Sequence, residues 1–351
     1  MTRVLVARLD GAGDVLLAGP AVRAVAASGA EVIMLVGPAG AAAARLLPGV
    51  ADVLTWTAPW VPADPPEVRP DAVADLVAEV RGRGVAEAVV LTSFHQSPLP
   101  TALVLRLAGV ARISGASVDY PGSLLDVRLR PGEDLPEDIA EPQRALAVAA
   151  AAGYRLPPGD AGRLAVRAPD PPPAEVADGG PYVVLHPGAA VQARRWPADH
   201  HARAAELLAA DGWRVVVTGG PDETALTARV AGVAGLDLGG RTSFAELAAV
   251  LAGAAVVVVG NTGAAHLAAA VGTPVVSLFA PVVPAVRWRP HGVAHVLLGD
   301  QEAPCRDTRA RTCPVPGHPC LAGVTAEDVV AAVTRLVQGS PSLSVMDQHA
   351  E

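Results

Sequence analysis

The sequence predicts an α/β protein with two doubly wound parallel-sheet domains in series. Three observations lead to this prediction. Short apolar runs alternate with Ala-rich helical stretches, the runs are apolar at consecutive positions as in strands buried on both faces, and the alternation starts again after a Pro-rich interruption. A chain of 351 residues is also longer than the chains that usually fold around a single hydrophobic core. We therefore expect two cores, each built around its own sheet.

The first half of the chain contains the first series of alternating elements. Runs rich in Val, Leu and Ile predict buried strands, and the longer stretches between them have helical spacing. The expected strands are residues 3–9, 31–36, 51–56 and 88–92. The expected helices are residues 15–27, 41–47, 71–83, 99–107 and 141–152. This order predicts a parallel sheet covered by helices.

The composition changes after this series, in the segment LPPGDAGRLAVRAPDPPPAEVADGG. Its Pro and Gly content cannot continue a helix or a central strand, so it is expected to contain a linker. We place an N-terminal Rossmann-like domain at residues 1–165, the Pro-rich linker at 166–180 and a C-terminal Rossmann-like domain at 181–338. The polar residues 339–351 are expected to form a disordered tail.

The alternation starts again in the second half. The expected strands are residues 182–186, 214–218, 255–259 and 274–278. The expected helices are residues 198–210, 223–233, 244–251, 264–271 and 326–337, of which the last could pack on either domain. Ligands of such sheets bind at the carboxyl ends of the strands, so we expect a substrate cleft between the two domains.

The charge and composition exclude several classes of protein. The net charge is −8, and the 27 basic residues, all of them Arg, form no basic stripe, which disfavours a nucleic-acid surface. No run reaches the roughly 18 apolar residues of a membrane span. The start, MTRVLVARL, lacks the longer apolar region and cleavage site of a signal peptide. Three Cys residues close together do not indicate a disulfide framework, so we expect a cytoplasmic protein.

The first motif that could carry chemistry is RLDGAGDVLLAGPAVRAV. Its Gly11 and Gly13 follow the first strand, but the third Gly of a dinucleotide turn is missing and Asp14 stands where a pyrophosphate would lie, which disfavours NAD. A carboxylate at a helix N-terminus is stabilised in its ionised form and suits a general base facing a hydroxyl. The alternative is that Asp14 is only an N-cap.

The second motif is GNTGAAHLAAAVGTPVV, which follows a strand of four Val residues and opens a helix. The backbone amides of Thr262, Gly263 and Ala264, with the Thr262 hydroxyl, can form an anion site, and His266 lies one turn further on. Two Gly residues in the turn allow the close approach that phosphate requires. The alternative is an ordinary cap beside a half-buried His266.

The third motif is HPGAAVQARRWPADHHARAAELLAADGWRVVVTGGPDE. A loop after the strand carries Arg194 and Arg195, and a planar, permanently charged guanidinium suits phosphate, although both could be solvated surface residues. Gly219 precedes the turn to the next helix, and Glu223 begins that helix and could accept hydrogen bonds from ribose hydroxyls.

In this order and at these separations, the three motifs resemble those of the family 9 glycosyltransferases, the bacterial heptosyltransferases that transfer heptose from ADP-heptose to the lipopolysaccharide core. The resemblance extends from GAGDVLLAGPAVR through HPGA, RRWP and GGPDE to NTGAAHLAAA and TPVVSLFAP, nearly the whole chain. It implies the GT-B architecture, in which two Rossmann-like domains face a central cleft, with the acceptor in the N-terminal domain and the nucleotide-sugar in the C-terminal one. It also implies an inverting single displacement that uses no metal and no cofactor.

The resemblance assigns roles by motif. Asp14 would be the catalytic base, Arg194, where the family often has Lys, would meet the diphosphate, and Glu223 would hold the ribose. Around the phosphates it places Thr262, Gly263 and His266. The complete expected donor-binding set is Arg194, Arg195, Gly219, Glu223, Asn261, Thr262, Gly263, Ala264 and His266, and the expected loop beside the acceptor is Gly11, Ala12 and Gly13.

One departure from the family concerns Asn261, the only Asn of the chain. The family motif usually begins with Asp at this point, close to the donor sugar, so an amide leaves the identity of the donor open; the alternative is that Asn261 only caps the helix. The Lys-free composition is typical of a GC-rich coding sequence, compatible with organisms that make no lipopolysaccharide. The expected acceptor is then a glycan, a glycolipid or a natural product, and peripheral association with the inner membrane face stays open.

Other functions are compatible with parts of the same sequence. The same fold could use a UDP- or GDP-linked sugar, or bind a nucleotide-sugar without turnover, and an epimerase would need acidic and basic groups around the sugar that the sequence does not locate. A structural zinc is a weakly indicated alternative for the segment CRDTRARTCPVPGHPC, because its spacings contain no Cys-x-x-Cys pair. The residues concerned are Cys305, Cys313, His318 and Cys320.

Overall fold

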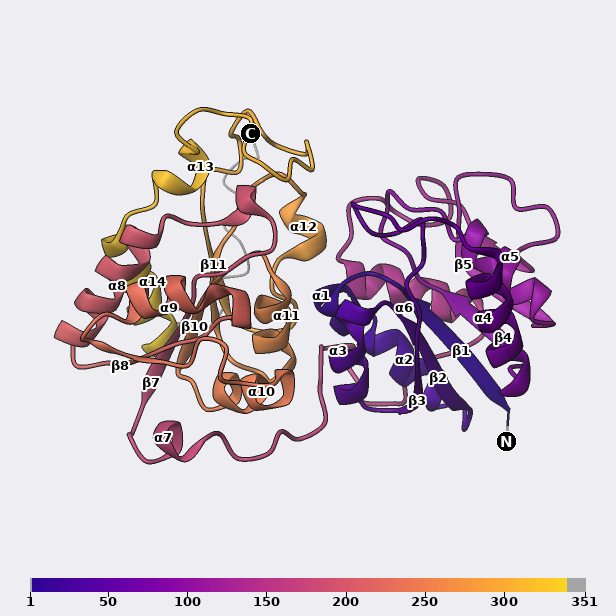
Figure 1. The fold of residues 1–351 in the computed structure, drawn as a ribbon, viewed down its shortest axis with the longest axis horizontal. Helices are drawn as coiled ribbons and strands as arrows, with labels where there is room; N and C mark the ends of the chain where they lie inside the picture. The colour runs from indigo at the N-terminus through magenta and orange to yellow at the C-terminus, as the bar shows by residue number, and fades with distance from the viewer. Residues whose placement is uncertain (1, 340–351) are drawn as a thin grey trace. The chain divides into compact units, whose positions relative to one another are not determined.

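The structure is a computed structural model that describes residues 2–339. It consists of two compact units, divided between Arg167 and Ala168, which we call the N-terminal and C-terminal units (Figure 1). The tail expected at residues 339–351 lies, apart from its first residue, outside the described residues. No helix within residues 2–339 is both long enough and apolar enough to cross a bilayer.

The N-terminal unit contains a six-stranded sheet in which every neighbouring pair of strands is parallel. The strand order is β3-β2-β1-β4-β5-β6. The strands are β1 (Arg3–Arg8), β2 (Glu31–Val36), β3 (Val50–Thr55), β4 (Glu87–Val90), β5 (Arg112–Ala116) and β6 (Val127–Leu129). Because β1 is central, its side chains are buried on both faces, which explains its apolar sequence.

Helices cover both faces of this sheet (Figure 1). They are α1 (Ala12–Leu17), α2 (Gly19–Ala26), α3 (Ala41–Leu46), α4 (Pro70–Gly82), α5 (Leu99–Leu107) and α6 (Glu141–Ala151), with a 3-10 turn η1 (Pro38–Gly40). Side chains alternate along a strand, so Leu5 and Ala7 of β1 pack in the core beneath α4 and α5. Arg8 therefore points to the opposite face, toward α6.

The C-terminal unit contains a second six-stranded parallel sheet, in the order β12-β11-β10-β7-β8-β9. Its strands are β7 (Tyr182–His186), β8 (Arg214–Val217), β9 (Gly235–Asp237), β10 (Val256–Gly260), β11 (Val275–Leu278) and β12 (His295–Leu298). Its helices and 3-10 turns are α7 (Ala174–Ala177), η2 (Gln192–Arg194), α8 (Ala198–Ala210), η3 (Pro221–Glu223), α9 (Thr224–Ala231), α10 (Phe244–Ala252), α11 (Gly263–Ala270), α12 (Ala285–Trp288), α13 (Pro319–Ala322) and α14 (Ala326–Val337).

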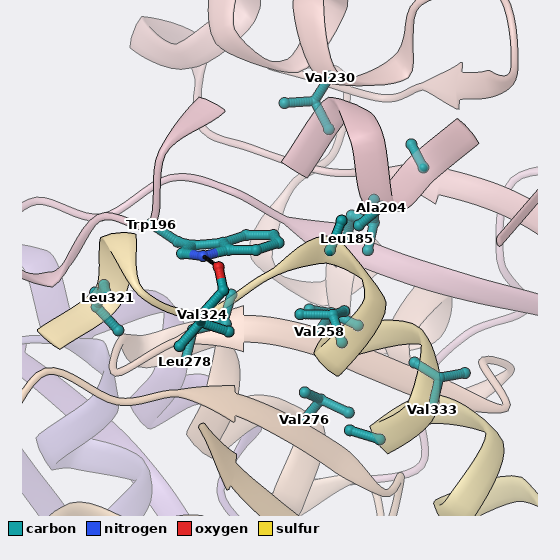
Figure 2. Close-up of a cluster of buried hydrophobic side chains, with 14 of the residues drawn as sticks. Leu185, Trp196, Ala204, Val230, Val258, Val276, Leu278, Leu321, Val324 and Val333 are labelled. Atoms are coloured by element: carbon teal, nitrogen blue, oxygen red, sulfur yellow. Dashed lines mark hydrogen bonds between the residues drawn. The ribbon is translucent and has the colours of Figure 1, made fainter. Parts of the chain in front are cut away.

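The last helix, α14, packs on the C-terminal unit, against α8 and the strands β10, β11 and β12. Its Val333 belongs to the same buried cluster as Leu185 of β7 and Val258 of β10 (Figure 2). Trp196, just before α8, also lies in this cluster and donates a hydrogen bond from Nε1 to the carbonyl oxygen of Val324, 3.1 Å away (Figure 2). The chain after the Cys-containing loop is thereby tied to the start of α8.

The two sheets have the same topology. In each, the first and fourth strands of the unit lie side by side at the centre and the strand order reverses between them: β1 and β4 in one, β7 and β10 in the other. Such a reversal opens a crevice at the carboxyl ends of the two central strands, where ligands of doubly wound sheets bind. The predicted fold class, two doubly wound parallel sheets, is confirmed.

Several predicted elements differ from the observed ones. The helix expected over residues 15–27 is two helices, because Pro20 lacks the N–H that a continuous helix would need, and α1 already begins at Ala12. The segment expected as a linker contains the short helix α7. Four strands were not predicted, and they are short and mostly at the sheet edges: β5, β6, β9 and β12.

Candidate active site

The carboxyl end of β1 holds a buried cluster of charges around Arg8. The Arg8 side chain is 3% exposed, and its guanidinium pairs with Asp10 (Nε to Oδ2, 2.8 Å), Asp14 (Nη2 to Oδ1, 2.9 Å) and Glu141 (Nη1 to Oε2, 3.4 Å). It also donates to Oγ of Ser93 at 2.8 Å. Burial by itself would lower the pKa of Arg8, but the three carboxylates outweigh burial and hold that pKa above its ordinary value.

Asp14 is the predicted base, and it lies in this cluster. Its side chain is 27% exposed, so one side of the carboxylate contacts Arg8 while the rest stays accessible. The N-cap of α1 is Gly11, and Asp14 is three residues further on. The interpretation of Asp14 as an N-cap is therefore wrong, since its carboxylate is oriented by a guanidinium from the strand before it.

Asp10 extends the cluster toward the next central strand. Gln96, in the loop after β4, donates from Nε2 to Oδ1 of Asp10 at 2.5 Å. Burial raises the pKa of the Asp10 carboxyl above its ordinary value; Arg8 opposes this increase and Asp14 adds to it. Arg8, Asp10, Gln96 and Glu141 were not among the predicted site residues. The available signal was an Arg and an Asp at the end of a fully apolar strand, where a charge needs a partner.

In the C-terminal unit, the carboxyl end of β10 leads into the predicted anion site. Asn261 is 3% exposed, and its Nδ2 has no hydrogen-bond partner among the described residues. The same holds for the buried Oγ1 of Thr262, which is the N-cap of α11 without making a cap hydrogen bond. Two parts of the alternatives for this motif are wrong: Asn261 is not the N-cap, and His266 is buried rather than half-buried.

The loop after β7 brings Arg194 to the same place. Arg194 is half-buried, and its Nη1 donates to the carbonyl oxygen of Asn261 at 3.4 Å. A Cβ on Gly260 would lie only 3.0 Å from the carbonyl oxygen of Arg194, so glycine permits this close approach. Arg195, in contrast, is exposed and donates to the carbonyl oxygen of Ala189 within its own loop. The structure thus brings one of the two predicted Arg residues to the start of α11.

Glu223 lies between the carboxyl ends of β7 and β8. Its Oε2 accepts from the backbone N–H of Gly220 at 2.9 Å, and a Cβ on Gly188 would lie 2.1 Å from its Oε1. At Gly219, which belongs to the predicted donor-binding set, a Cβ would meet Thr227 at 2.6 Å. Two turns therefore close tightly around the Glu223 carboxylate at the carboxyl end of this sheet.

Two His residues lie near this end of β7, the half-buried His186 and the buried His201. His186, the last residue of β7, pairs through Nδ1 with Oγ1 of Thr218 at 2.9 Å, and burial lowers its pKa although Glu223 opposes this. Burial lowers the pKa of His201, in α8, to about 3, and the neighbouring His186 and His200 add to this effect. Both imidazoles are therefore neutral at pH 7.

The zinc interpretation of the Cys segment is not supported. Among residues 2–339, no group of three or more His, Cys, Asp or Glu side chains is arranged to hold a metal ion. His318 pairs instead with the carbonyl oxygen of Ala193, and Cys313 with that of Val315. Cys305 and Cys320 are buried free thiols, and burial next to Cys305 raises the pKa of Cys320 to about 12.

Comparison with known proteins identifies the family. Residues 101–318 match the family model of glycosyltransferase family 9 (heptosyltransferase), which is more than half of the chain. The chain belongs to glycosyltransferase family 9. It is 33% identical to lipopolysaccharide heptosyltransferase 3 of Escherichia coli over 168 residues, 45% of this chain and 48% of that protein. It is 35% identical to lipopolysaccharide heptosyltransferase 1 of Pseudomonas aeruginosa over 144 residues, 40% of this chain and 39% of that protein. These matches span about half, or less, of the curated relatives.

The fold of this family 9 chain matches solved structures over nearly its full length. The E. coli ADP-heptose lps heptosyltransferase II has a TM-score of 0.72 at 19% identity, covering 96% of this chain and 99% of that one. The glycosyl transferase family 9 protein of Veillonella parvula has a TM-score of 0.75 at 15% identity, covering 96% and 97%. These matches confirm the expected GT-B architecture with two Rossmann-like domains.

Proposed function

We propose that this family 9 protein is an inverting, metal-independent glycosyltransferase that moves a sugar from an ADP-activated donor to an acceptor hydroxyl. The observation that carries the proposal is the unpartnered polar set at the start of α11, where Asn261 Nδ2 and Thr262 Oγ1 are buried beside Arg194. Burying such groups is costly unless a ligand pairs with them, and the position is the ligand site of this sheet topology.

The donor diphosphate would bind at this helix start. The first amides of α11 have no carbonyl partner within the helix, and the positive end of the helix dipole favours an anion. Arg194 would add a permanent positive charge, which stabilises the leaving diphosphate without a metal ion. Glu223, at the ends of β7 and β8, would accept hydrogen bonds from the ribose.

Asp14 would supply the base. Its carboxylate takes the proton of the acceptor hydroxyl as that oxygen bonds to the anomeric carbon; the bond from this carbon to the diphosphate breaks, and the diphosphate leaves with the electron pair. One displacement from the opposite side inverts the anomeric centre. Arg8 would hold the carboxylate in place by contacting one side of it. The other side of the carboxylate would stay open to the acceptor.

The names of similar proteins favour ADP and heptose. One related solved structure is described as E. coli heptosyltransferase WaaC with ADP-2-deoxy-2-fluoro heptose. Asn261 stands where the family usually has Asp, so the identity of the donor sugar stays open. The acceptor would be a glycan, a glycolipid or a natural product. A cytoplasmic location, with peripheral association at the inner membrane face for a lipid-linked acceptor, belongs to the same proposal.

Thermal unfolding in the presence of ADP, UDP, GDP and NAD tests the donor. A ligand at about 100 times its Kd adds about 2.7 kcal/mol of stability, so ADP should raise the Tm clearly and NAD should not. UDP or GDP acting instead of ADP would mean another nucleotide-sugar. Binding of ADP without any transfer from an ADP-sugar, over a broad set of acceptors, would favour a non-catalytic binding protein.

A further inference from the structure

The N-terminal unit has a pocket of about 270 Å³ beside the carboxyl ends of β1 and β4. Strand alternation places it on the face of β1 opposite to Arg8, since Ala7 and Leu9 line the pocket while Arg8 points toward α6. Its volume is near the lower end of the roughly 300–1,000 Å³ of ligand pockets, which suits a single sugar-sized ring. The pocket therefore lies at the switch point of its sheet, next to the cluster that contains Asp14.

One wall of the pocket is a fixed aromatic ring. Trp60 comes from the loop between β3 and α4, and its Nε1 donates to Oγ1 of Thr101, on α5, at 3.3 Å. The ring of Trp56 packs edge-on against it, with ring centroids 5.3 Å apart. These contacts from two directions hold the indole in place before any ligand arrives. An indole face presented in this way can pack against the C–H groups of a sugar ring or against an aromatic aglycone.

The polar wall of the pocket is connected to the predicted base. Gln96 lines the pocket and donates to Asp10, Asp10 pairs with Arg8 at 2.8 Å, and Arg8 pairs with Asp14 at 2.9 Å. Gln96 and its neighbours in the pocket offer amide, hydroxyl and imidazole groups, which exchange hydrogen bonds with hydroxyls. A ring whose hydroxyls bind this wall would thus be close to the charge cluster.

The lining contains no Arg, Asp or Glu. The nearest guanidinium in the hydrogen-bonded chain, that of Arg8, is already paired with three carboxylates. A phosphate or a carboxylate needs cationic donors for tight binding, and the polar wall is linked through Gln96 to the carboxylate of Asp10 and not to a cation. An uncharged ring needs no cationic donor.

We propose that this pocket selects the acceptor, and that it takes an uncharged, hydroxyl-bearing ring with an apolar face in preference to a phosphorylated or carboxylated sugar. Trp60 is the specificity-determining residue, with Thr101 and Gln96 positioning its ring and the ligand hydroxyls. The inference rests on the proposed function, because only a transferase needs an acceptor. It narrows the acceptor to neutral glycosides and to aglycones with a neutral ring.

Binding of three matched probes to the full chain tests the inference. Phenyl β-D-glucoside, phenyl β-D-glucuronide and phenyl β-D-glucoside 6-phosphate share the phenyl group and the pyranose ring and differ at C6, which carries a hydroxyl, a carboxylate or a phosphate. By calorimetric titration without nucleotide, the neutral glucoside should bind at least about tenfold more tightly than either anionic probe, the loss expected when a charge enters a site without a counter-charge.

Three variants locate the binding. Trp60→Ala should weaken glucoside binding about tenfold or more, whereas Trp60→Phe, which keeps an aromatic face, should keep most of it. Trp213→Phe changes a Trp of the C-terminal unit and should leave glucoside binding unchanged. The ADP-induced rise in Tm should be the same in all three variants, which shows that each still folds.

The outcomes separate the two proposals. Equal or tighter binding of an anionic probe, no binding of any probe at millimolar concentration, or full binding by Trp60→Ala would overturn the neutral-acceptor inference. If ADP still raises the Tm in those cases, the proposed donor site is unaffected. If the neutral probe binds through Trp60 but no nucleotide raises the Tm, the proposed function fails while the chemistry of the pocket stands.

Discussion

The two sheets have one topology but opposite chemistry at their carboxyl ends. At the end of β1, Arg8 pairs with three carboxylates and donates to a hydroxyl, so its charge is compensated within the protein. At the end of β10, Asn261 Nδ2 and Thr262 Oγ1 are buried without a partner among the described residues. The charges at the first end are thus balanced within the protein, whereas the second end has neutral buried polar groups that a ligand could satisfy.

This difference shows that strand order fixes where a site lies and not what the site does. The crevice at each reversal of strand order follows from the topology alone. Its chemistry follows from the residues that leave the strand: an Arg on an inward-facing position in β1, and an Asn-Thr turn followed by a helix after β10. The five predictions below test the two ends against each other.

The largest effect is expected for Asp14→Asn, which removes the base and keeps the shape of the side chain. Turnover should fall by about a thousandfold or more, within the range of a lost general base, with ADP affinity nearly unchanged because the donor residues belong to the other unit. Steady-state kinetics and ADP titration measure both quantities. Asp119→Asn, an exposed carboxylate of the same unit, is the control. A decrease of less than tenfold for Asp14→Asn would rule out its role as the base.

Arg8→Met should be the most destabilising of these substitutions. It leaves Asp10, Asp14 and Glu141 without their shared guanidinium, and breaking such a buried cluster costs about 3–5 kcal/mol. Arg194→Met is the matched variant at the other end: it loses a 3.4 Å hydrogen bond to a neutral carbonyl, so it should cost at most about 1 kcal/mol while weakening ADP binding. Denaturant unfolding of both variants is the measurement. Equal losses of stability would contradict the contrast between the two ends.

His201→Gln should reduce the sensitivity of the C-terminal unit to acid. The pKa of His201 is about 3 in the folded chain against an ordinary value of 6.5, so its contribution to stability is complete above pH 6.5 and is lost as the pH falls toward 3. Between pH 6.5 and about 4.5 this loss amounts to about 2–3 kcal/mol. The raised pKa of Asp10 acts in the opposite direction, because it makes stability decrease as the pH rises above 3.8. Tm measured against pH should therefore be compared between variant and wild type; identical slopes would refute the prediction.

Asn261→Asp should change the choice of donor sugar. A carboxylate only accepts hydrogen bonds from sugar hydroxyls, whereas an amide also donates, so relative kcat/KM between heptose and hexose donors should shift by about ten- to a hundredfold. ADP affinity should change little. Measuring both donors with both proteins decides the matter. Equal losses for every donor, or a large fall in ADP binding, would show that position 261 shapes the turn and does not contact the sugar.

The smallest expected effect is that of a chelator. If Arg194 and the start of α11 stabilise the leaving diphosphate, then transfer should continue at an unchanged rate in EDTA. Loss of activity that Mg²⁺ or Mn²⁺ restores would overturn the metal-independent mechanism. Restoration by Zn²⁺ alone would instead direct attention to the loop of Cys305, Cys313 and Cys320.

The sequence by itself determined the central strands, most of the helices and the order of the three motifs. A run such as Val256–Gly260 predicts a buried strand because its apolar character is local and needs no partner to be recognised. Three of the four edge strands, β6, β9 and β12, escaped prediction because they are short and partly exposed, so pairing with a neighbour, and not their own composition, makes them strands. The break before α2 could have been inferred, since Pro20 is visible in the sequence.

Only the tertiary structure decided which polar residues meet. Arg8 and Glu141 are 133 positions apart in the sequence. Trp60 lies in a loop and Thr101 in helix α5, so no spacing rule connects the members of either pair. The same holds for Asn261, whose burial without a partner depends on the loop that brings Arg194 across Gly260. Local pattern encodes the strand and the turn through short-range sterics and periodicity. The charge cluster, the aromatic pocket and the unpartnered amide arise from long-range packing, which a sequence read segment by segment does not contain.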